Sequence, residues 1–401
     1  MEERTQAYLR GRFGDHYRRT EFTPPPDANE REWGFIPWTE GPGETMVRHR
    51  SLLDLGELGD FLQRKRPKHV YFSAGRYRDP SASSMSAKEW RSSDLVFDLD
   101  ADHLPSVTLG EDSYAEMLAK CKDALRRLLD FLKNDFGFED LTIVFSGGRG
   151  YHVHVRDDGI QTLERDARRE IVDYVRGIGL EADELFRTEI RGTTTAKVLN
   201  KEGGWGGRIH QRLVALADDL EQMSRDEALD RLTAIDGIGD GRANTILGAV
   251  SPDDDVEGGT QNEEVEINRA AIAEGNTEIG GVGMNALIDA LLDEVLLEDI
   301  APIDEPVTTD TNRLIRLPGS LHGGSGLSVV RIDPAALDDF DPLVDAVPET
   351  FRGHDITIEV TEGGPVELGG DSFTLEPGIG TYPEHVGIFA MARGRAEKGK
   401  E

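Results

Sequence analysis

The spacing of apolar and polar residues predicts alternating strands and helices over roughly the first half of the chain. Short apolar or alternating runs predict strands, because a strand turns successive side chains to opposite faces. The predicted strands are Val70–Phe72, Asp94–Phe97, Ile143–Phe145 and Tyr151–Val155. Apolar residues at helical spacing predict helices from about Tyr114 to Lys133 and from about Gln161 to Ile178.

The second half begins with a helical pattern from Ile209 to Val250 and an acidic, apolar-poor segment, Ser251–Asn268, that reads as an inserted loop. A predicted helix over Met284–Leu297 returns the chain to strand-like segments. These are Leu314–Leu317, Ser328–Val330, Ile356–Val360 and Asp371–Thr374. The pattern therefore predicts a mixed α/β fold: residues 1–205 and 284–401 form one core, and residues 206–283 form a helical insert.

Two carboxylates end the apolar run Leu95–Asp100. Asp98 and Asp100 alternate with apolar residues, so a strand would project both from one face. Adjacent carboxylates repel unless a cation lies between them, and oxygen ligands suit Mg²⁺ or Mn²⁺. Glycosyltransferases and several hydrolases also use an Asp-x-Asp pair, and solvated strand-end aspartates are common.

A glycine-rich basic loop follows the Ile143–Phe145 strand. Its sequence, Ser146-Gly147-Gly148-Arg149-Gly150, leads into a strand that carries His152. Glycines let the backbone approach an anion closely, and Arg149 offers a planar pair of donors to phosphate oxygens. A plain hairpin with a buried histidine is the structural alternative.

A second basic loop lies near residue 320. Arg316 ends a strand-like run, Pro318-Gly319-Ser320 predicts a turn, and His322 follows it. Asp304 lies upstream and offers a third carboxylate. A purely structural turn is the alternative, and it gives Arg316 and His322 no function. Two loops that each carry an Arg and a His suggest instead a site for a triphosphate.

These segments together resemble a known family. FDLDAD, SGGRGYH and PIDEPVT followed by RLIRLPGSLHG, in this order and spacing, are similar to the small catalytic subunit of the archaeal and eukaryotic-type DNA primase. Arg31–Phe35 and Val70–Gly75 resemble further family segments. The resemblance implies the primase catalytic fold, with metal bound by the catalytic acids Asp98, Asp100 and Asp304. It also implies nucleotide binding by Ser146, Arg149, His152, Arg316, His322 and Arg48.

The resemblance further implies a function in replication. The expected reaction is template-directed nucleotidyl transfer, which makes short RNA and DNA primers from nucleoside triphosphates on single-stranded DNA by a two-metal mechanism. A large-subunit partner and a role in DNA repair are implied as well. A stand-alone primase-polymerase, an end-joining polymerase and a non-catalytic DNA-binding subunit are the alternatives.

Cysteine usage departs from many members of that family. The chain has a single cysteine, Cys121, whereas a four-coordinate zinc site needs Cys and His in pairs. A structural zinc is therefore not expected, and a disulfide within the chain is excluded. Nothing resembles a signal peptide or a membrane span, so we expect a cytoplasmic protein with no membrane partner.

The charge balance is strongly acidic. The chain carries 77 acidic against 45 basic residues, a net charge of −32. Nucleic-acid enzymes usually show the reverse, and a dense carboxylate surface with little lysine is typical of halophilic proteins. At molar salt the Debye length is about 3 Å, so only local basic segments such as Arg64–Lys68 and Arg76–Arg78 would attract DNA.

The helical insert contains one further motif. Leu232–Ile246 resembles the hairpin of a helix-hairpin-helix motif, in which the backbone amides of Gly237-Ile238-Gly239 would contact DNA phosphate without reading sequence. Acidic residues flank the hairpin and favour an ordinary helical turn instead. Contact with DNA is one of two open interpretations.

Overall fold

The computed structural model describes residues 1–39, 43–191, 194–250, 265, 267–276 and 281–400. The chain divides into two compact units. The first comprises Met1–Arg126, Phe138–Val172 and Pro302–Glu401, and the second comprises Arg127–Gly137 and Asp173–Ala301. The second unit contains the predicted insert, residues 206–283, and extends beyond it on both sides. The assignment of residues 1–205 and 284–401 to one catalytic core stays a prediction.

The first sheet of unit 1 is antiparallel. Its strand order is β10-β3-β1-β2, and β4 pairs with the end of β3. The strands are β1 (Arg31–Ile36), β2 (Val47–Arg50), β3 (His69–Tyr77), β4 (Trp90–Ser93) and β10 (Leu314–Arg316). Its central strand β3 is buried along almost its whole length, as the apolar run at Val70–Phe72 predicted.

The second sheet, also antiparallel, has the order β11-β6-β7-β5. Its strands are β5 (Leu95–Asp100), β6 (Leu141–Phe145), β7 (Gly150–Val155) and β11 (Val330–Ile332). The predicted strand Ser328–Val330 was wrong in position. The amide of Ser328 bonds to the carbonyl of Ala346 instead of to the sheet, so pairing with β6 begins only at Val330.

The two sheets meet through a small apolar core and a buried ion pair. The core joins Ala74 of β3 to Val96 of β5, together with Val307 and Ile315. The Phe72 and His154 rings stack across the interface at 5.9 Å between centroids. Arg31 and Asp94, both fully buried, pair at 2.9 Å. These contacts fix the ends of the strands that carry the candidate residues.

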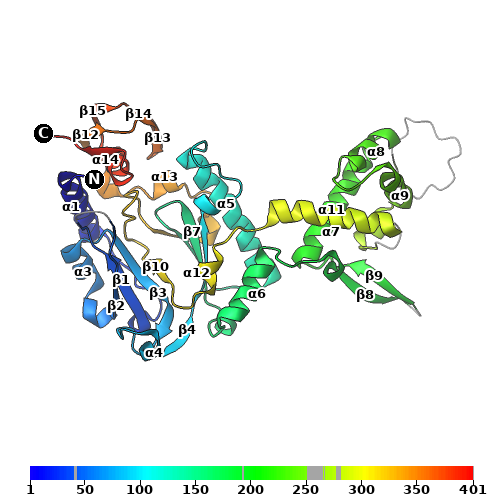
Figure 1. The fold of residues 1–401 in the computed structure, drawn as a ribbon, viewed down its shortest axis with the longest axis horizontal. Coiled ribbons are helices and arrows are strands. Elements are labelled where there is room, and N and C mark those ends of the chain that lie inside the picture. The colour runs from blue at the N-terminus through cyan, green and yellow to red at the C-terminus, as the bar shows by residue number, and fades with distance from the viewer. Residues whose placement is uncertain (40–42, 192–193, 251–264, 266, 277–280, 401) are drawn as a thin grey trace. The chain divides into compact units, whose positions relative to one another are not determined.

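Helix α5 (Tyr114–Asp130) is amphipathic and lies beside β7 (Figure 1). Its Cys121 thiol lies 3.7 Å from the carbonyl oxygen of Leu99, so the helix packs against β5. The predicted helix at 114–133 is confirmed, and a π-helical turn, Phe131–Asp135, extends it. The predicted helix at 161–178 is shorter in the structure, as α6 (Arg165–Val175).

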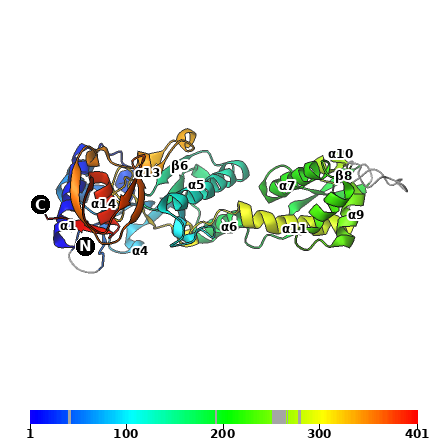
Figure 2. The same cartoon turned by 90° about the horizontal axis from the view of Figure 1, so that it is seen from above.

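The remaining elements of unit 1 lie outside these two sheets. The helices are α1 (Glu3–Arg19), α2 (Leu52–Leu55), α3 (Leu58–Lys65), α4 (Met85–Lys88), α12 (Glu305–Thr309), α13 (Pro342–Asp345) and α14 (Glu384–Ala392). The strands are β12 (Asp355–Val360), β13 (Gly364–Leu368), β14 (Asp371–Leu375), β15 (Gly378–Pro383) and β16 (Ala396–Lys398). Figure 2 shows α14 against these carboxyl-terminal strands. Both chain ends lie together, since the Met1 amino group pairs with Glu397 at 3.3 Å.

Unit 2 is mostly helical. It contains the hairpin of β8 (Phe186–Arg191) and β9 (Thr194–Leu199) and the helices α7 (Gly204–Leu220), α8 (Arg225–Thr233), α9 (Asp240–Val250), α10 (Arg269–Ala273) and α11 (Gly281–Asp299). Of the predicted acidic loop Ser251–Asn268, residues 251–264 and 266 lie outside the described residues.

Candidate active site

The two strand carboxylates share one face of β5. Phe97 and Leu99 are fully buried on the other face, while the side chains of Asp98 and Asp100 are 22% and 37% exposed. Across the ladder, Asp98 faces His152 and Asp100 faces Gly150 on β7. A Cβ at Gly150 would lie only 1.8 Å from the carbonyl oxygen of Leu99. Glycine therefore permits the close strand pairing that brings the loop to the carboxylates.

Asp98 lies beside the candidate histidine. His152 Nε2 lies 3.3 Å from Asp98 Oδ1, and the imidazole is only 5% exposed. Burial raises the pKa of Asp98, but His152, Arg313 and Arg316 lower it more, so the net pKa lies below its ordinary value. Asp98 is therefore held as a carboxylate at neutral pH.

The glycine-rich loop places Arg149 over the end of β5. The Ser146 amide bonds to the carbonyl of Gly150 at 2.9 Å, which closes the loop. Arg149 pairs with Asp102 at 2.6 Å and lies 3.8 Å from Asp100. Asp102 was missed at the sequence level, although it belongs to the same FDLDAD run. Its pairing with Arg149 holds the guanidinium beside the carboxylates.

His322 lies against this loop. A Cβ at Gly148 would meet His322 Nε2 at 3.1 Å. The Gly324 amide donates to His322 Nδ1 at 3.3 Å. Burial and the charge of Arg316 lower the pKa of His322 well below its usual value, so the ring is neutral. With Nδ1 accepting, the proton sits on Nε2, which makes that nitrogen a donor.

A cavity of about 370 Å³ gathers several candidates from different elements. Four candidate residues line it: Arg48, Asp98, His152 and Arg316. Arg316 packs its guanidinium 5.6 Å from the Tyr71 ring centre, and its buried Nε has no hydrogen-bond partner in the structure. Arg313 also lines the cavity and was missed, although it belongs to the same basic run as Arg316.

The third acid is tied to the first by the backbone. The Asp304 amide donates to the carbonyl oxygen of Asp98 at 3.0 Å. Asp304 precedes α12 without capping it through its side chain, which leaves that carboxylate available. Asp304 does not line the cavity, whereas Asp310 does. Asp304 is therefore linked to Asp98 through the backbone, whereas Asp310 shares the cavity with Asp98.

These carboxylates fit a divalent cation in their donor chemistry. No three acidic or histidine side chains within the described parts of the chain form a compact metal-holding group. However, Asp98 and Asp100 offer oxygen donors on one face, and the Asp304 carboxylate is not used in capping. Oxygen donors are what Mg²⁺ and Mn²⁺ prefer. The donor set therefore suits a hard cation.

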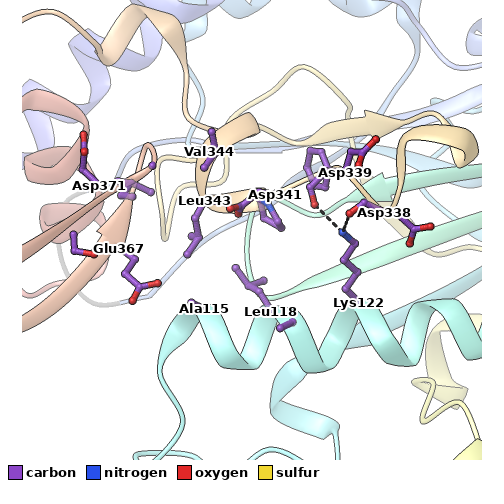
Figure 3. Close-up of a pocket in the computed structure, with 16 residues that line it drawn as sticks. Ala115, Leu118, Lys122, Asp338, Asp339, Asp341, Leu343, Val344, Glu367 and Asp371 are labelled. Atoms are coloured by element: carbon purple, nitrogen blue, oxygen red, sulfur yellow. Dashed lines mark hydrogen bonds between the residues drawn. The ribbon is translucent and has the colours of Figure 1, made fainter.

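Another cavity in unit 1 contains none of these residues. This cavity, of about 470 Å³, separates α5 from residues 338–344 and the β13–β14 hairpin. Figure 3 shows Lys122 reaching the backbone there, with bonds to the carbonyls of Asp338 and Phe340. Apart from this lysine its charged side chains are carboxylates, and no candidate residue lines it. It would repel a triphosphate, so we exclude it as the active site.

The predicted hairpin of unit 2 forms between α8 and α9. Ile235 and Ile238 are each 4% exposed and anchor it, while Gly237 adopts a φ of 79°. A Cβ at Gly237 or Gly239 would meet no atom within 4 Å, so the glycines face open space. The helical hairpin is as expected, and its contact with DNA stays a prediction.

Two sequence-level exclusions concern cysteine and membranes. Cys121 is buried and its thiol is free. Within the part of the chain that the structure describes, no helix is both long and apolar enough to cross a bilayer.

Comparison with known proteins gives one consistent result. The sequence model of a family described as DNA primase small subunit matches residues 97–334. The DNA primase small subunit PriS of Haloarcula marismortui is 68% identical over 408 residues, and that of Halobacterium salinarum is 58% identical over 407, each across 100% of both chains. The protein of the same name from Methanocella arvoryzae is 39% identical over 99% of both chains. The family match includes Asp98, His152 and Arg316 of the cavity, and the full-length relatives also cover Arg48.

Proposed function

Because this chain belongs to the DNA primase small subunit family, we propose that it is the catalytic subunit of a primase. It is a nucleotidyltransferase that acts as a DNA-directed RNA polymerase, joining nucleoside triphosphates into short primers on a single-stranded DNA template. The observation that carries the proposal is the cavity that places Asp98 beside Arg48, His152 and Arg316. Carboxylate and guanidinium groups on one wall suit a phosphate-transfer reaction.

Asp98, Asp100 and Asp304 would hold the divalent metal, Mg²⁺ or Mn²⁺, which supplies Lewis-acid stabilisation of the attacking and leaving oxygens. Asp98 can serve as a ligand without first losing a proton, because its pKa is already lowered.

The basic side chains would position the triphosphate. Arg316 presents a guanidinium at the cavity wall, and the neutral His322 offers its Nε2 proton to a phosphate oxygen. Arg149, held by Asp102, extends this donor set toward Asp100. Fixed donors of this kind stabilise the charge that develops on the phosphates as the bond to the leaving group breaks.

We further propose a large-subunit partner in the cytoplasm. The small-subunit name of the relatives supports a second, larger chain.

Primer synthesis by the purified chain tests the proposal. The chain is incubated in 2 M KCl with Mg²⁺ or Mn²⁺, nucleoside triphosphates and single-stranded DNA, with and without a candidate large subunit. We expect short products that require both the template and the metal. If no product forms under any of these conditions, including with the partner present, the proposal is wrong.

A further inference from the structure

A fully buried carboxylate binds one of the arginines that line the cavity. Glu32 lies on β1, and its side chain is 0% exposed. Its carboxylate accepts from Arg48 Nε at 3.1 Å and Nη2 at 3.3 Å, so the guanidinium is gripped by both oxygens. Arg48 also lines the catalytic cavity. Glu32 therefore acts on the cavity through Arg48 and does not line it.

The backbone around Arg48 is bent toward this carboxylate. The β1–β2 register shifts between Trp33 and Phe35, which makes a bulge opposite Gly34. Within the bulge His49 takes a left-handed φ of 59°, which is uncommon outside glycine. The His49 amide donates to Glu32 Oε1 at 2.9 Å. A bulge redirects a side chain, and here Glu32 fixes the bulge that directs Arg48.

Gly34 permits this arrangement. A Cβ at Gly34 would lie 3.1 Å from the carbonyl oxygen of Val47 and 3.2 Å from Leu314 Cδ1. The glycine in REWGF therefore lets β2 approach β1 closely enough for Arg48 to reach Glu32.

A second buried charge completes the cluster. Lys88, at the end of α4, is also 0% exposed and places its Nζ 2.8 Å from Glu32 Oε2. The ammonium donates to the carbonyl of Pro80 at 2.8 Å and lies 5.1 Å from the Tyr77 ring centre. Desolvating an ammonium and a carboxylate is expensive, and apolar residues often fill such positions at no loss of stability. The pair therefore invites an explanation beyond folding.

The charge sum supplies that explanation. Glu32 and Arg48 alone would form a neutral pair with little attraction for a triphosphate. Adding Lys88 gives the cluster one net positive charge, and Arg48 is the member that reaches the cavity. Because Lys88 is shielded from solvent, salt screens its charge much less than it screens surface charges.

We propose that Glu32 and Lys88 are positioning residues that aim Arg48 and leave the cluster with a net positive charge, so that two residues outside the cavity set its affinity for nucleoside triphosphate. The inference rests on the proposed function and on contact of Arg48 with the nucleotide, which the family resemblance implies.

Binding of Mg-ATP to the full-length chain in 2 M KCl, measured by calorimetry, tests the charge sum. Lys88→Met makes the cluster neutral and should weaken ATP binding by about tenfold. Adding Glu32→Gln to Lys88→Met restores one positive charge, and the remaining side-chain carbonyl oxygen can still accept from the His49 amide, so the double variant should recover most of the loss. If Glu32 and Lys88 had only a structural role, the double variant would bind ATP no more tightly than Lys88→Met.

Arg91→Met is the matched control. It also removes a cation paired with a glutamate, Glu30, but the Arg91 side chain is 57% exposed and is absent from the cavity wall. Its ATP affinity should equal that of the parent. Single-stranded DNA binding should be unchanged in all of these variants, and a parallel loss of DNA binding would contradict the assignment to the nucleotide.

A second comparison applies if Lys88→Met does not fold. Glu32→Gln and the double variant differ only in the Lys88 charge, and neither buries an unpaired carboxylate. The double variant should bind ATP about tenfold more weakly than Glu32→Gln, and equal affinities would overturn the inference.

The ATP-binding test and the primer-synthesis assay can fail independently. A chain that makes primers but binds ATP equally well with and without Lys88 overturns this inference alone. A chain that makes no primers but loses ATP affinity with Lys88 overturns the proposed function alone. A parent chain that does not bind Mg-ATP contradicts both.

Discussion

The amide of Asp304 donates a hydrogen bond to the carbonyl oxygen of Asp98, at 3.0 Å. The whole of unit 2 lies between these residues in the sequence, yet the bond fixes the start of α12 to the strand of paired carboxylates. It also gives a structural reason why an isolated aspartate before a turn could belong to the active site.

Substitution of Asp304 and of Asp310 tests which of the two is the third catalytic acid. Asp304→Ala should reduce primer synthesis by about three orders of magnitude, because it removes a carboxylate that the proposed metal site needs. Asp310→Ala should keep synthesis within about tenfold of the parent, because Asp310 would at most adjust the charge of the cavity. Initial rates on one template measure both.

The backbone bond to Asp98 survives both substitutions, so equal melting temperatures serve as the control. Loss of synthesis in Asp310→Ala alone would show that Asp310, which lines the cavity, is the third catalytic acid.

Arg316 tests the nucleotide assignment. Arg316→Ala removes the guanidinium from the cavity wall and should raise KM for nucleoside triphosphate by about 10- to 100-fold, as expected for the loss of a charge-assisted contact. Arg316→Lys should be intermediate, because lysine keeps the charge but loses the planar donors. Fluorescence anisotropy should show unchanged binding of single-stranded DNA. An equal loss of DNA binding would place Arg316 in a template channel.

Much of this site was predictable because its chemistry is local in sequence. Alternation alone put Asp98 and Asp100 on one face, and a glycine-rich hairpin put Arg149 beside them. The predicted strand at 328–330 was displaced because Ser328 bonds to Ala346, a tertiary contact that no local pattern encodes.

The residues that support the site were harder to predict from the sequence. Nothing in the local sequence pairs Glu32 with Lys88, since they meet only when β1 and α4 fold together. Asp102 and Arg313, in contrast, lie inside the motifs that were recognised, and their proximity to Asp100 and Arg316 was the available signal.

A buried carboxylate at the sheet interface predicts acid sensitivity. Burial raises the pKa of Asp94, but the neighbouring His154 and the charges of Arg31 and Arg156 hold its pKa well below the ordinary value. A lowered pKa in the folded state stabilises the protein above the unfolded pKa of about 4, and this stability is lost as the pH falls below it.

Urea unfolding between pH 7 and pH 3 measures this contribution. Asp94→Asn should lose about 3–5 kcal/mol at pH 7, because it breaks a buried ion pair. Its stability should then fall less steeply than that of the parent below pH 4. Asp339→Asn, at an exposed carboxylate, should follow the parent. Parallel pH profiles for the parent and Asp94→Asn would contradict this role.

The acidic surface predicts a dependence on salt. With 77 acidic residues, dilution from 1 M to 0.1 M salt lengthens the Debye length from about 3 Å to about 10 Å and increases repulsion among carboxylates. The melting temperature should fall steadily on dilution, and activity should be optimal above about 1 M KCl, although salt weakens DNA binding itself. A melting temperature that is flat or rises between 2 M and 0.1 M KCl would assign the acidic excess another purpose.

The central claim is that the carboxylates on β5 carry out metal-dependent nucleotide transfer. Asp98→Asn and Asp100→Asn each remove a charge with little change of shape, and Asp98→Asn leaves the backbone bond to Asp304 in place. The decisive measurement is the rate of primer synthesis by each variant and by the parent, in 2 M KCl with saturating Mg²⁺ or Mn²⁺. We predict a loss of about three or more orders of magnitude in each variant with the fold intact, and synthesis within tenfold of the parent would contradict the account.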